Sequence, residues 1–206
     1  MERVTVKLFA PETSVMLLID HQVGTLGFCR NIPEKMIVQN TRALARFAKA
    51  LGMPVVLTTS QEQNAQGPLI PAMEEILPDA YAARVKRSGV ANAWNDPDYR
   101  AAVEAAAGDR KDLIVAGLTN DVCIAYPALS MVEAGYRVLV VQDAGGSPNQ
   151  IAEDTARRFW ENAGARTTTT NALAAELGQD WSSPNGAAMI GIVFEEIISQ
   201  LDEMSA

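Results

Sequence analysis

Short runs of apolar residues alternate along this chain with longer segments in which apolar residues recur every three or four positions. The short runs lack the polar alternation of a strand that faces water on one side. Continuous apolar strands are typical of parallel sheets that are covered on both faces. We expect strands at residues 15–20, 55–60, 83–87, 112–117, 137–143 and 165–170, the third of them weak.

The longer segments have the spacing of amphipathic helices. In residues 34–52, the apolar positions that share one helical face are Ile37, Leu44, Phe47, Ala48 and Leu51. Asp96 is a good cap for a helix that begins at Pro97 and runs to about residue 107. Further helices are expected near residues 67–77, 123–134, 147–164 and 171–177.

Strand and helix therefore alternate about six times along the chain. This order predicts an α/β fold, a Rossmann-like three-layer αβα sandwich around a mainly parallel sheet of about six strands. With 206 residues, 48% of them hydrophobic, the chain fits one domain over residues 1–206. The sequence contains no internal repeat, low-complexity tract or linker that would divide it.

A last amphipathic segment, at about residues 184–204, does not belong to that alternation. Its apolar stripe consists of Ile190, Val193, Ile197, Leu201 and Met204. An apolar stripe on a helix must be buried against something. This helix either covers the core of its own domain or makes oligomer contacts with a neighbouring subunit.

The charge of the chain excludes some classes of partner. A net charge of −8 and a pI of about 4.7 argue against nucleic acid or an anionic membrane, which attract positive surfaces. The early apolar run at residues 15–19 ends at Asp20, whereas a membrane-spanning helix needs about 20 apolar residues. The chain also begins without the pattern of a signal peptide, so we expect a cytoplasmic protein.

Two cysteines and one histidine limit the chemistry that depends on thiols and metals. Cys29 and Cys123 cannot build a disulfide framework, and we interpret Cys29 as incidental. A catalytic zinc typically needs about three protein ligands, commonly including histidine. Because His21 is the single histidine, we expect neither a bound metal nor another cofactor.

Polar residues follow several of the expected strands at their carboxyl ends. Asp20 ends the first strand, Arg87 with Lys86 beside it ends the third, Cys123 follows the fourth and Asp143 ends the fifth. In an open parallel sheet, sites lie beyond these ends. Residues that are distant in sequence are therefore expected to meet at one rim.

Pro127 indicates where the helix after the fourth strand begins. Proline lacks an amide hydrogen and clashes with the carbonyl four residues earlier, so it fits only in the first turn. The helix therefore cannot begin much before Cys123. The positive end of a helix dipole favours a thiolate, so we expect a lowered pKa for this thiol.

Together these groups suggest a cysteine nucleophile with its base. Asp20 would take the thiol proton of Cys123, and Arg87 would offset negative charge and orient the groups. Backbone amides at the start of the helix would receive the oxyanion. Purely structural interpretations stay open, with Cys123 as a small buried hydrophobe, Asp20 as a cap and Arg87 as a surface cation.

Two neighbouring residues have further interpretations. Asp143 fits a loop anchor better than a catalyst. His21, beside Asp20, is either a satisfied interior histidine or part of the lining of a pocket.

Three segments resemble the isochorismatase-like cysteine hydrolases. They are VMLLIDHQVG around Asp20, KRSGVANAWND around Arg87, and VAGLTNDVCIAYPALSMVEAGYRVLVVQDAGG around Cys123. The resemblance extends over roughly residues 13–177, and the third segment is the most specific. Within the family the chain is most similar to the YcaC-like hydrolases. They share DHQ after the first strand, an arginine shortly before NAW and a proline four residues after the cysteine.

The resemblance implies a catalytic triad of Asp20, Arg87 and Cys123. Most of the family has lysine in the central position, so Lys86 is the alternative cation for that role. Arginine stays charged and is a poor proton shuttle. Arg87 would therefore act electrostatically, and Asp20 would transfer the protons.

The resemblance also implies an oxyanion hole near the cysteine. The family usually has a cis peptide shortly before it, which by position would be Thr119–Asn120 here. The backbone amides of Asn120 and Cys123 would then be the donors. The candidates for substrate binding are His21, Phe28, Asn92 and Trp94. A lid would come from the region of Phe28, the loop at residues 61–68 and a neighbouring subunit.

Two further properties of the family bear on cofactors and partners. Nicotinamidases of the family hold a metal through an aspartate and two histidines, a site that this chain, with His21 alone, cannot form. Related YcaC-like proteins assemble as octamers made from two rings. The resemblance therefore implies a metal-free homo-oligomer.

We expect a cofactor-free hydrolase of small amide or carbamoyl C–N bonds that acts on a small-molecule substrate through a thioester at Cys123. Cleavage of an enol ether, as in isochorismatases, is one alternative, although that chemistry does not require a cysteine. A non-catalytic oligomeric scaffold or binding protein of the same fold is another. A redox thiol is a weaker one, because no C-x-x-C pair surrounds Cys123.

Overall fold

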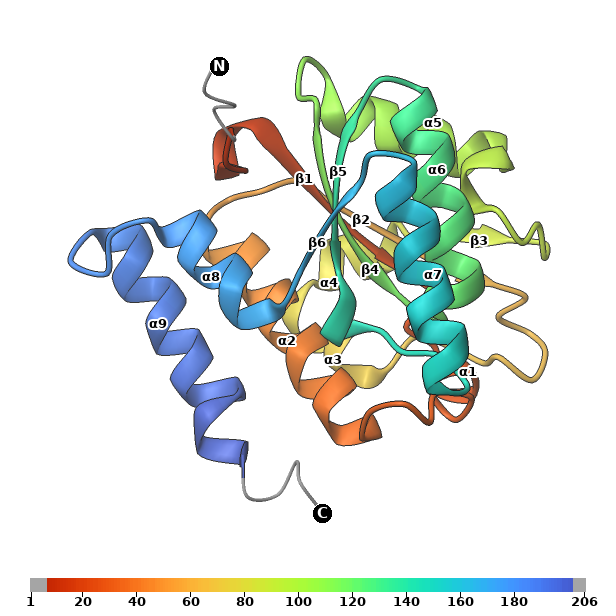
Figure 1. Ribbon diagram of the computed structural model, residues 1–206, viewed down its shortest axis with the longest axis horizontal. Coiled ribbons are helices and arrows are strands. Elements are labelled where there is room, and N and C mark those ends of the chain that lie inside the picture. The colour runs from red at the N-terminus through yellow and green to blue at the C-terminus, as the bar shows by residue number, and fades with distance from the viewer. Residues whose placement is uncertain (1–6, 202–206) are drawn as a thin grey trace.

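The computed structural model describes residues 7–201, and at its centre lies one sheet of six parallel strands. They are β1 (Ser14–Ile19), β2 (Val55–Ser60), β3 (Val85–Arg87), β4 (Asp112–Gly117), β5 (Arg137–Val141) and β6 (Arg166–Thr168). Their order in the sheet is β3-β2-β1-β4-β5-β6 (Figure 1). The strand order changes direction between β1 and β4, where such sheets bind ligands.

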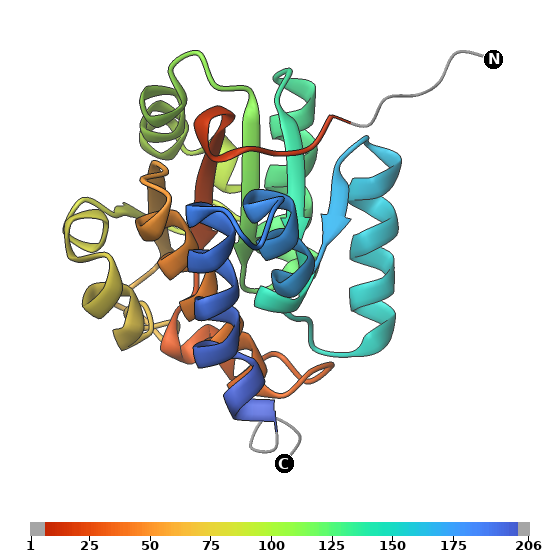
Figure 2. The same ribbon diagram turned by 90° about the vertical axis from the view of Figure 1, so that its left-hand side faces the viewer.

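Helices cover both faces of the sheet, which confirms the predicted three-layer arrangement (Figure 2). One face packs against α2 (Glu34–Ala50), α3 (Pro71–Ile76), α8 (Thr170–Gly178) and α9 (Pro184–Glu196). The other packs against α5 (Pro97–Ala107), α6 (Ala125–Glu133) and α7 (Gln150–Asn162). None of the helices between residues 7 and 201 has both the length and the hydropathy needed to cross a membrane.

Shorter helical pieces lie in the connections. They are α1 (Val23–Leu26), α4 (Pro78–Ala82), η1 (Pro11–Thr13), η2 (Ala93–Asn95), η3 (Asn120–Ile124), η4 (Gln142–Ala144) and η5 (Ile198–Gln200). The turn η3 is π-helical and the other η turns are 3₁₀-helical. The helix predicted after β4 therefore consists of a π-helical turn followed by α6.

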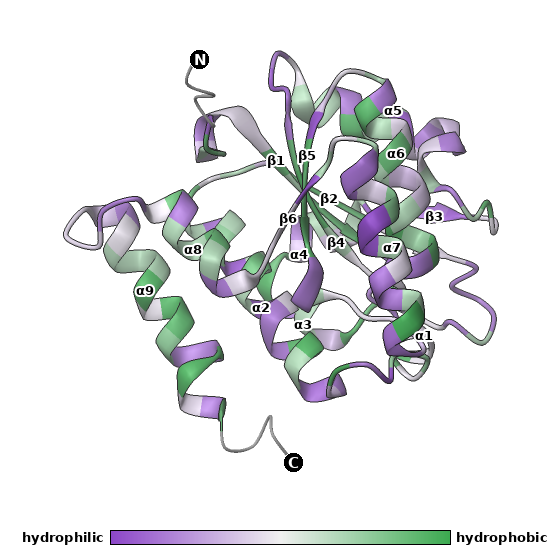
Figure 3. Ribbon diagram, in the orientation of Figure 1, coloured by the Kyte–Doolittle hydropathy of each residue, from purple (hydrophilic) through white to green (hydrophobic). Residues whose placement is uncertain are grey.

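The central strand β1 explains why the apolar runs are uninterrupted. It lies between β2 and β4, and every one of its residues is buried. Met16 and Leu18 belong to the core on the α2 side, whereas Val15, Leu17 and Ile19 belong to the core on the α5 side. Successive side chains of a strand point to opposite faces, so both must be apolar when both faces are covered. In Figure 3, the inner strands β2 and β4 are green, whereas the outermost strands β3 and β6 are mainly purple.

The last strand is shorter than expected because the threonines after it belong to the next helix. Thr169 caps α8, and its hydroxyl accepts a hydrogen bond from the backbone N–H of Ala172. The backbone N–H and the hydroxyl of Thr170 both donate to Asp143 Oδ1 at 2.8 Å. Asp143 thus anchors the loop after β6 to the end of β5.

The C-terminal helix differs from its prediction in length and in orientation. It ends at Glu196 and is followed by η5, and the predicted stripe residue Met204 lies outside the described residues. The face that packs on the domain carries Met189, Ile192 and Val193. Of the described members of the predicted stripe, Val193 alone is buried.

Two arginines of α2 determine which face of α9 turns inward. Arg42 Nε and Arg46 Nη1 lie 2.8 and 2.7 Å from the carboxylate of Glu196, whose side chain is only 7% exposed. This pairing draws the face that carries Glu196 onto the domain. The large apolar side chains left exposed on α9 and beyond are Phe194, Ile198 and Leu201.

Candidate active site

The carboxyl ends of β1, β3 and β4 bring together the three residues of the predicted triad. Asp20 follows β1, Arg87 is the last residue of β3, and Cys123 lies in η3 after β4. The strands β1 and β4 pair in parallel up to Ile19 and Gly117, so the segments that leave them start side by side. The sheet register, rather than sequence proximity, assembles this site.

Asp20 leaves the sheet through an unusual backbone turn. Its φ of 56° lies in the left-handed region, which few residues other than glycine adopt. Its N–H still donates to the Thr58 carbonyl at 3.0 Å, and its own carbonyl accepts from the Gln22 N–H at 2.7 Å. The turn leaves the side chain of Asp20 fully buried at the end of the central strand.

Arg87 is bonded directly to Asp20. Its Nη2 donates to Asp20 Oδ2, and both side chains are fully buried. Its Nε donates to Thr58 Oγ1 at 3.0 Å, and its Nη1 donates to the Val90 carbonyl at 2.6 Å. Every nitrogen of this guanidinium therefore has a fixed partner, and the cation neutralises a carboxylate that burial would otherwise penalise.

Lys86, the alternative cation, points away from this pair. Its Nζ lies 3.3 Å from Glu62, and its side chain is 53% exposed. Neighbouring residues of a strand project to opposite faces, so only one of Lys86 and Arg87 can reach Asp20. The structure places Arg87 there.

The thiol of Cys123 interacts with the same carboxylate. Asp20 Oδ1 is buried and has no partner that meets the geometry of a full hydrogen bond. Asp20 and Cys123 nevertheless interact closely enough that each side chain shifts the pKa of the other. Oδ1 is thus the oxygen left to accept the thiol proton.

The expected lowering of the thiol pKa is wrong for this geometry. Burial, together with the negative charge of Asp20, raises the pKa of Cys123 to about 12, against smaller opposing effects of Arg87 and a backbone hydrogen bond from Thr119. Burial also raises the pKa of Asp20, and Arg87 opposes that rise. Desolvation and a neighbouring anion therefore outweigh the helix start, and the resting side chain is a protonated thiol.

The turn before Cys123 differs from the prediction by one residue. The cis peptide bond joins Leu118 to Thr119 rather than Thr119 to Asn120. Leu118 still continues the sheet, since its N–H donates to the Ile19 carbonyl at 3.0 Å. The N–H of Asn120 donates to the Gly146 carbonyl at 2.8 Å, so it is already used and does not serve as the predicted oxyanion donor.

A buried glutamate supports this turn from behind. Asn120 Nδ2 donates to Glu153 Oε1 at 2.9 Å, and Ser147 Oγ donates to Glu153 Oε2 at 2.6 Å. Gln142 Nε2 also donates to Glu153 Oε1, at 2.6 Å. Glu153 is 2% exposed and lies on α7, outside every motif that the sequence suggested. A lone glutamate in a helix gave no signal that it would be buried.

A cavity of about 270 Å³ opens in front of Asp20 and Cys123. Its lining consists of Asp20, Gln22, Thr25, Phe28, Ser60, Gln66, Leu118, Thr119, Asp121, Val122, Cys123 and Pro148. Phe28 is 62% exposed. The regions predicted to form a lid, around Phe28 and in the loop at residues 61–68, both contribute to the lining. Arg87 does not line the cavity and acts from behind Asp20.

Gln22 attaches the loop at residues 61–68 to the site. Its Nε2 donates to the carbonyls of Ser60 and Gly67, and its Oε1 accepts from the Ser60 N–H at 2.8 Å. Gly24 lies so close to this loop that a Cβ there would stand 1.9 Å from the Ala65 carbonyl oxygen. Glycine is therefore required at that contact. Although Gln22 stands in the DHQ segment, no sequence pattern predicted this role for it.

His21 is an interior histidine and does not line the cavity. It is buried, and its Nε2 lies 2.8 Å from the Ala144 carbonyl. Burial lowers its pKa to about 4, so the ring is neutral at physiological pH. Although His21 is adjacent to Asp20 in sequence, its side chain packs against the loop after β5 instead.

Asn92 and Trp94 also lie away from the cavity. Asn92 Nδ2 donates to Ser130 Oγ of α6 at 2.9 Å, and Asn92 Oδ1 accepts from the Trp94 N–H at 3.1 Å. The Trp94 ring is buried edge-on against Tyr136. These two residues connect η2 to the helical layer and do not shape the pocket.

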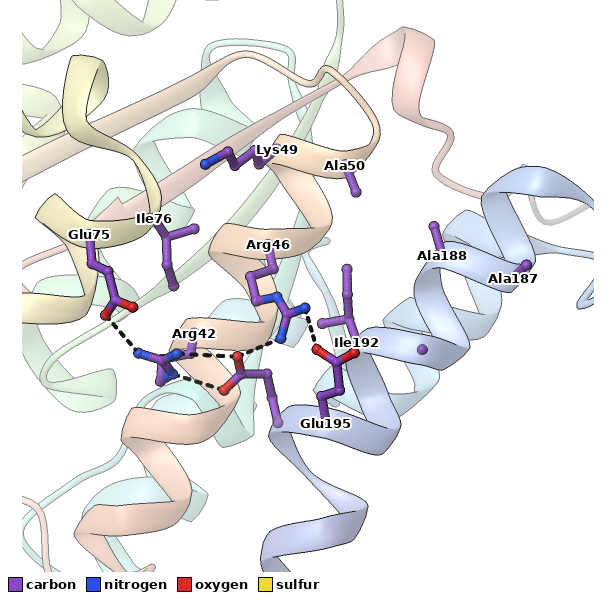
Figure 4. Close-up of a pocket in the computed structure, with 12 residues that line it drawn as sticks. Arg42, Arg46, Lys49, Ala50, Glu75, Ile76, Ala187, Ala188, Ile192 and Glu195 are labelled. Carbon is purple, nitrogen blue, oxygen red and sulfur yellow. Dashed lines mark hydrogen bonds and ion pairs between the residues drawn. The ribbon is translucent and has the colours of Figure 1, made fainter.

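A larger groove of about 680 Å³ lies elsewhere, between α2, α3 and α9 (Figure 4). Arg42 reaches Glu75 at 3.3 Å as well as Glu196. Arg46 pairs with Glu195 and Glu196. Among the described residues that line it, the groove holds no cysteine, histidine or hydroxyl side chain, and its ion pairs brace α9 against the domain. The smaller cavity is the one lined by Asp20 and Cys123.

Within residues 7–201, no three His, Cys, Asp or Glu side chains cluster in a way that could hold a metal ion. The Asp20 carboxylate is instead engaged by Arg87 and faces the Cys123 thiol. A carboxylate beside a thiol is an arrangement that can transfer a proton.

Comparison with known proteins identifies the family. Residues 14–172 match the Isochorismatase domain. The chain belongs to the isochorismatase family. Over 168 residues, it is 40% identical to Probable hydrolase YcaC of Escherichia coli strain K12, covering 82% of this chain and 79% of that protein.

Two solved structures extend the likeness to the whole fold. The structure of YcaC from Pseudomonas aeruginosa with hexane-2,5-diol and covalent acrylamide has a TM-score of 0.88 at 34% identity, covering 98% of this chain and 97% of that one. The crystal structure of YcaC from Escherichia coli, an octameric hydrolase of unknown specificity, has a TM-score of 0.88 at 35% identity, covering 98% and 96%. This isochorismatase-family hydrolase is thus YcaC-like, as the three segments around Asp20, Arg87 and Cys123 predicted.

Proposed function

We propose that this hydrolase cleaves small amide or carbamoyl C–N bonds with Cys123 as nucleophile and Asp20 as general base. One observation carries the proposal. The two oxygens of Asp20 have different surroundings, since Oδ2 is held by Arg87 while buried Oδ1 is unpaired beside the thiol in the cavity. A carboxylate fixed at one oxygen and free at the other is poised to accept one proton.

The first half-reaction begins from the neutral thiol. Asp20 Oδ1 takes the proton of Cys123 as the sulfur attacks the carbonyl carbon, so no free thiolate accumulates, in accord with the thiol pKa of about 12. The π electrons of the C=O bond move to the oxygen, which gives a tetrahedral oxyanion. The backbone N–H of Cys123 is the candidate donor, since the N–H groups of Asn120 and Val122 already donate to the carbonyls of Gly146 and Thr119. Collapse expels the amine, which takes the proton from Asp20 and leaves a thioester.

The second half-reaction regenerates the enzyme. Asp20 removes a proton from water as the water oxygen attacks the thioester carbon. Collapse of this intermediate breaks the C–S bond, and the proton on Asp20 returns to the Cys123 sulfur. The product is the carboxylic or carbamic acid. Arg87 remains charged throughout and transfers no proton, since a guanidinium does not lose one in this pH range.

The relatives support this assignment. The Escherichia coli relative is named a probable hydrolase. The structure from Pseudomonas aeruginosa contains covalent acrylamide, an electrophile that reacts with thiols and also carries a primary amide. An accessible nucleophilic cysteine in this chain would react with such an electrophile.

We also propose that the chain works as a homo-oligomer in the cytoplasm. The Escherichia coli relative is octameric and covers nearly the whole chain. Phe194, Ile198 and Leu201 leave an apolar strip on α9 and beyond that a second copy would cover. Both cysteines are free, as is usual in a reducing compartment.

The test is turnover on a panel of small primary amides and carbamates, followed by ammonia release and by mass spectrometry of acid-quenched enzyme. We expect an acyl adduct on Cys123 and a loss in kcat/KM of about 1,000-fold or more for Cys123→Ala. Cys29→Ala is the matched control, because Cys29 is buried and outside the cavity lining. Turnover that survives Cys123→Ala would disprove the nucleophile. No turnover and no adduct across the panel would favour a non-catalytic scaffold.

A further inference from the structure

Among the described residues that line the Cys123 cavity, three have a buried oxygen atom without a hydrogen-bond partner. The atoms are Asp20 Oδ1, Thr25 Oγ1 and Asp121 Oδ1. Asp20 is 0% exposed and Thr25 is 8% exposed. Leaving such atoms unpaired costs about 1–3 kcal/mol each, so they mark places where a bound molecule supplies the missing partner. The Cys123 thiol accounts for Asp20, whereas no neighbouring group of the protein accounts for the other two.

Within residues 7–201, the charged side chains that line the cavity are all acidic. Among the described residues that line it, the charged ones are Asp20 and Asp121, and none is lysine, arginine or histidine. The guanidinium of Arg87 offsets Asp20 but is fully buried, and its nitrogens are committed to Asp20, Thr58 and Val90. The carboxylate of Asp121 is therefore left without a compensating cation in the lining.

Asp121 is also placed next to the chemistry. It precedes Cys123 by two residues in the same π-helical turn, while Thr25 comes from α1 in a different part of the chain. Because Asp121 and Cys123 line the same cavity, a group held by Asp121 would lie near the sulfur. An ionised carboxylate accepts hydrogen bonds only, so its ligand must donate them, whereas the Thr25 hydroxyl can donate or accept.

We propose that Asp121, assisted by Thr25, binds an N–H donor group of the substrate, and that the substrate class is neutral or cationic amides without a carboxylate. This inference rests on the proposed amide hydrolysis and narrows its substrates. An anionic substrate would face an unpaired carboxylate and no cation, which costs binding. The apolar lining residues Phe28, Leu118 and Val122 would contact the uncharged part of the substrate.

The test uses alkylation of Cys123, which does not require turnover. The probes are 2-bromoethylammonium, iodoacetamide and iodoacetate, and each rate at Cys123, read by peptide mass spectrometry, is divided by its rate with N-acetylcysteine. In the wild type we expect the ammonium reagent to be favoured over the carboxylate reagent by about tenfold or more. Asp121→Asn should reduce that ratio by about tenfold, whereas Asp121→Glu should retain most of it.

Two further variants separate local from general effects. Asp98→Asn removes the same charge from an exposed position on α5 and should leave the ratio unchanged. Thr25→Val should slow iodoacetamide at Cys123 by about threefold without changing the ratio of charged reagents. An equal ratio in wild type and Asp121→Asn would overturn the proposal, and so would faster reaction of iodoacetate or failure of all three reagents to modify Cys123. If the charge preference is found but no amide is turned over, the proposed hydrolysis is wrong and the binding role of Asp121 still holds.

Discussion

Asp20 and Arg87 form a fully buried ion pair across two strands, and the pair is bonded through one carboxylate oxygen only. The cation allows the carboxylate to stay at the centre of the fold, while the second oxygen remains open to the thiol of Cys123. The contact therefore stabilises the fold and also leaves one oxygen of Asp20 available for proton transfer. Variants of Arg87 and of Asp20 separate these two effects.

Removing the cation should destabilise the fold in a pH-dependent way. Arg87→Met leaves a buried carboxylate unpaired, which costs about 3–5 kcal/mol in the free energy of unfolding. The loss of Arg87 would raise the folded pKa of Asp20 still further above its unfolded value of about 3.9. The variant is then penalised above that pH and much less below it, where the carboxyl is neutral in both states.

Urea unfolding of wild type and Arg87→Met at pH 7 and near pH 4 measures this effect. Lys86→Met is the matched control, and its exposed side chain should change the free energy of unfolding by no more than about 0.5 kcal/mol. An equal loss for both variants at pH 7 would show that the sheet does not depend on Arg87.

The pH dependence of Cys123 alkylation should report a protonated resting thiol. Because burial and Asp20 raise its pKa to about 12, the rate with iodoacetamide should increase steadily from pH 7 to 10 without a plateau. Asp20→Asn removes a negative charge that raises this pKa, so alkylation should become faster at a given pH while amide turnover is lost. A plateau below pH 8 in the wild type would contradict the burial of this thiol beside a carboxylate.

His21 should make the fold sensitive to mild acid. Burial lowers its pKa from 6.5 to about 4, so between these values the unfolded chain binds a proton that the folded chain does not. Its contribution to stability is therefore full above pH 6.5 and is lost as the pH falls towards 4, by about 3 kcal/mol in total. His21 is the single histidine, so its ring C–H resonances in a proton NMR titration report it without overlap from another histidine. A midpoint near pH 6 in the folded protein would refute the prediction.

Glu153 should position the turn before the nucleophile. In Glu153→Gln, one oxygen that accepts from Asn120, Gln142 or Ser147 becomes an amide donor, which should cost about 1–3 kcal/mol of stability. We expect kcat for amide turnover to fall more than KM rises, because the displaced turn carries Cys123 itself. Glu133→Gln, at an exposed position of α6, is the control. An unchanged kcat would assign Glu153 to stability alone.

The oligomer should depend on the apolar strip of α9 and beyond. A Phe194→Ser, Ile198→Ser double variant should reduce the mass of the assembly measured by light scattering, because it removes apolar area that a second copy would bury. Ile151→Ser changes an apolar side chain that is 80% exposed on α7 and serves as the control. An assembly of unchanged mass in the double variant would place the subunit contact elsewhere.

Much of the fold follows directly from local patterns. Uninterrupted apolar runs such as residues 15–19 require a strand covered on both faces, and their alternation with helical segments requires a parallel sheet. Strand ends in such a sheet share one rim, so the spacing of Asp20, Arg87 and Cys123 along the chain is enough to predict that they meet. The pattern of the C-terminal helix predicted its existence but misplaced its buried face, because the Arg42 and Arg46 partners of Glu196 come from α2, about 150 residues earlier.

The choice of cation, the free hydrogen-bond donors and the pKa of the thiol depend on the groups that surround each atom, so they follow only from the tertiary packing. It selected Arg87 over Lys86, bonded the Asn120 N–H to Gly146, and buried Cys123 beside a carboxylate so that its pKa rises. It also left Asp121 unpaired in the cavity wall. Sequence spacing determines which residues share a strand end, but desolvation and hydrogen-bond partners come from distant segments. Local patterns are therefore enough to predict the sheet and the rim where Asp20, Arg87 and Cys123 meet, whereas packing sets the protonation, the free donors and the polarity of the site.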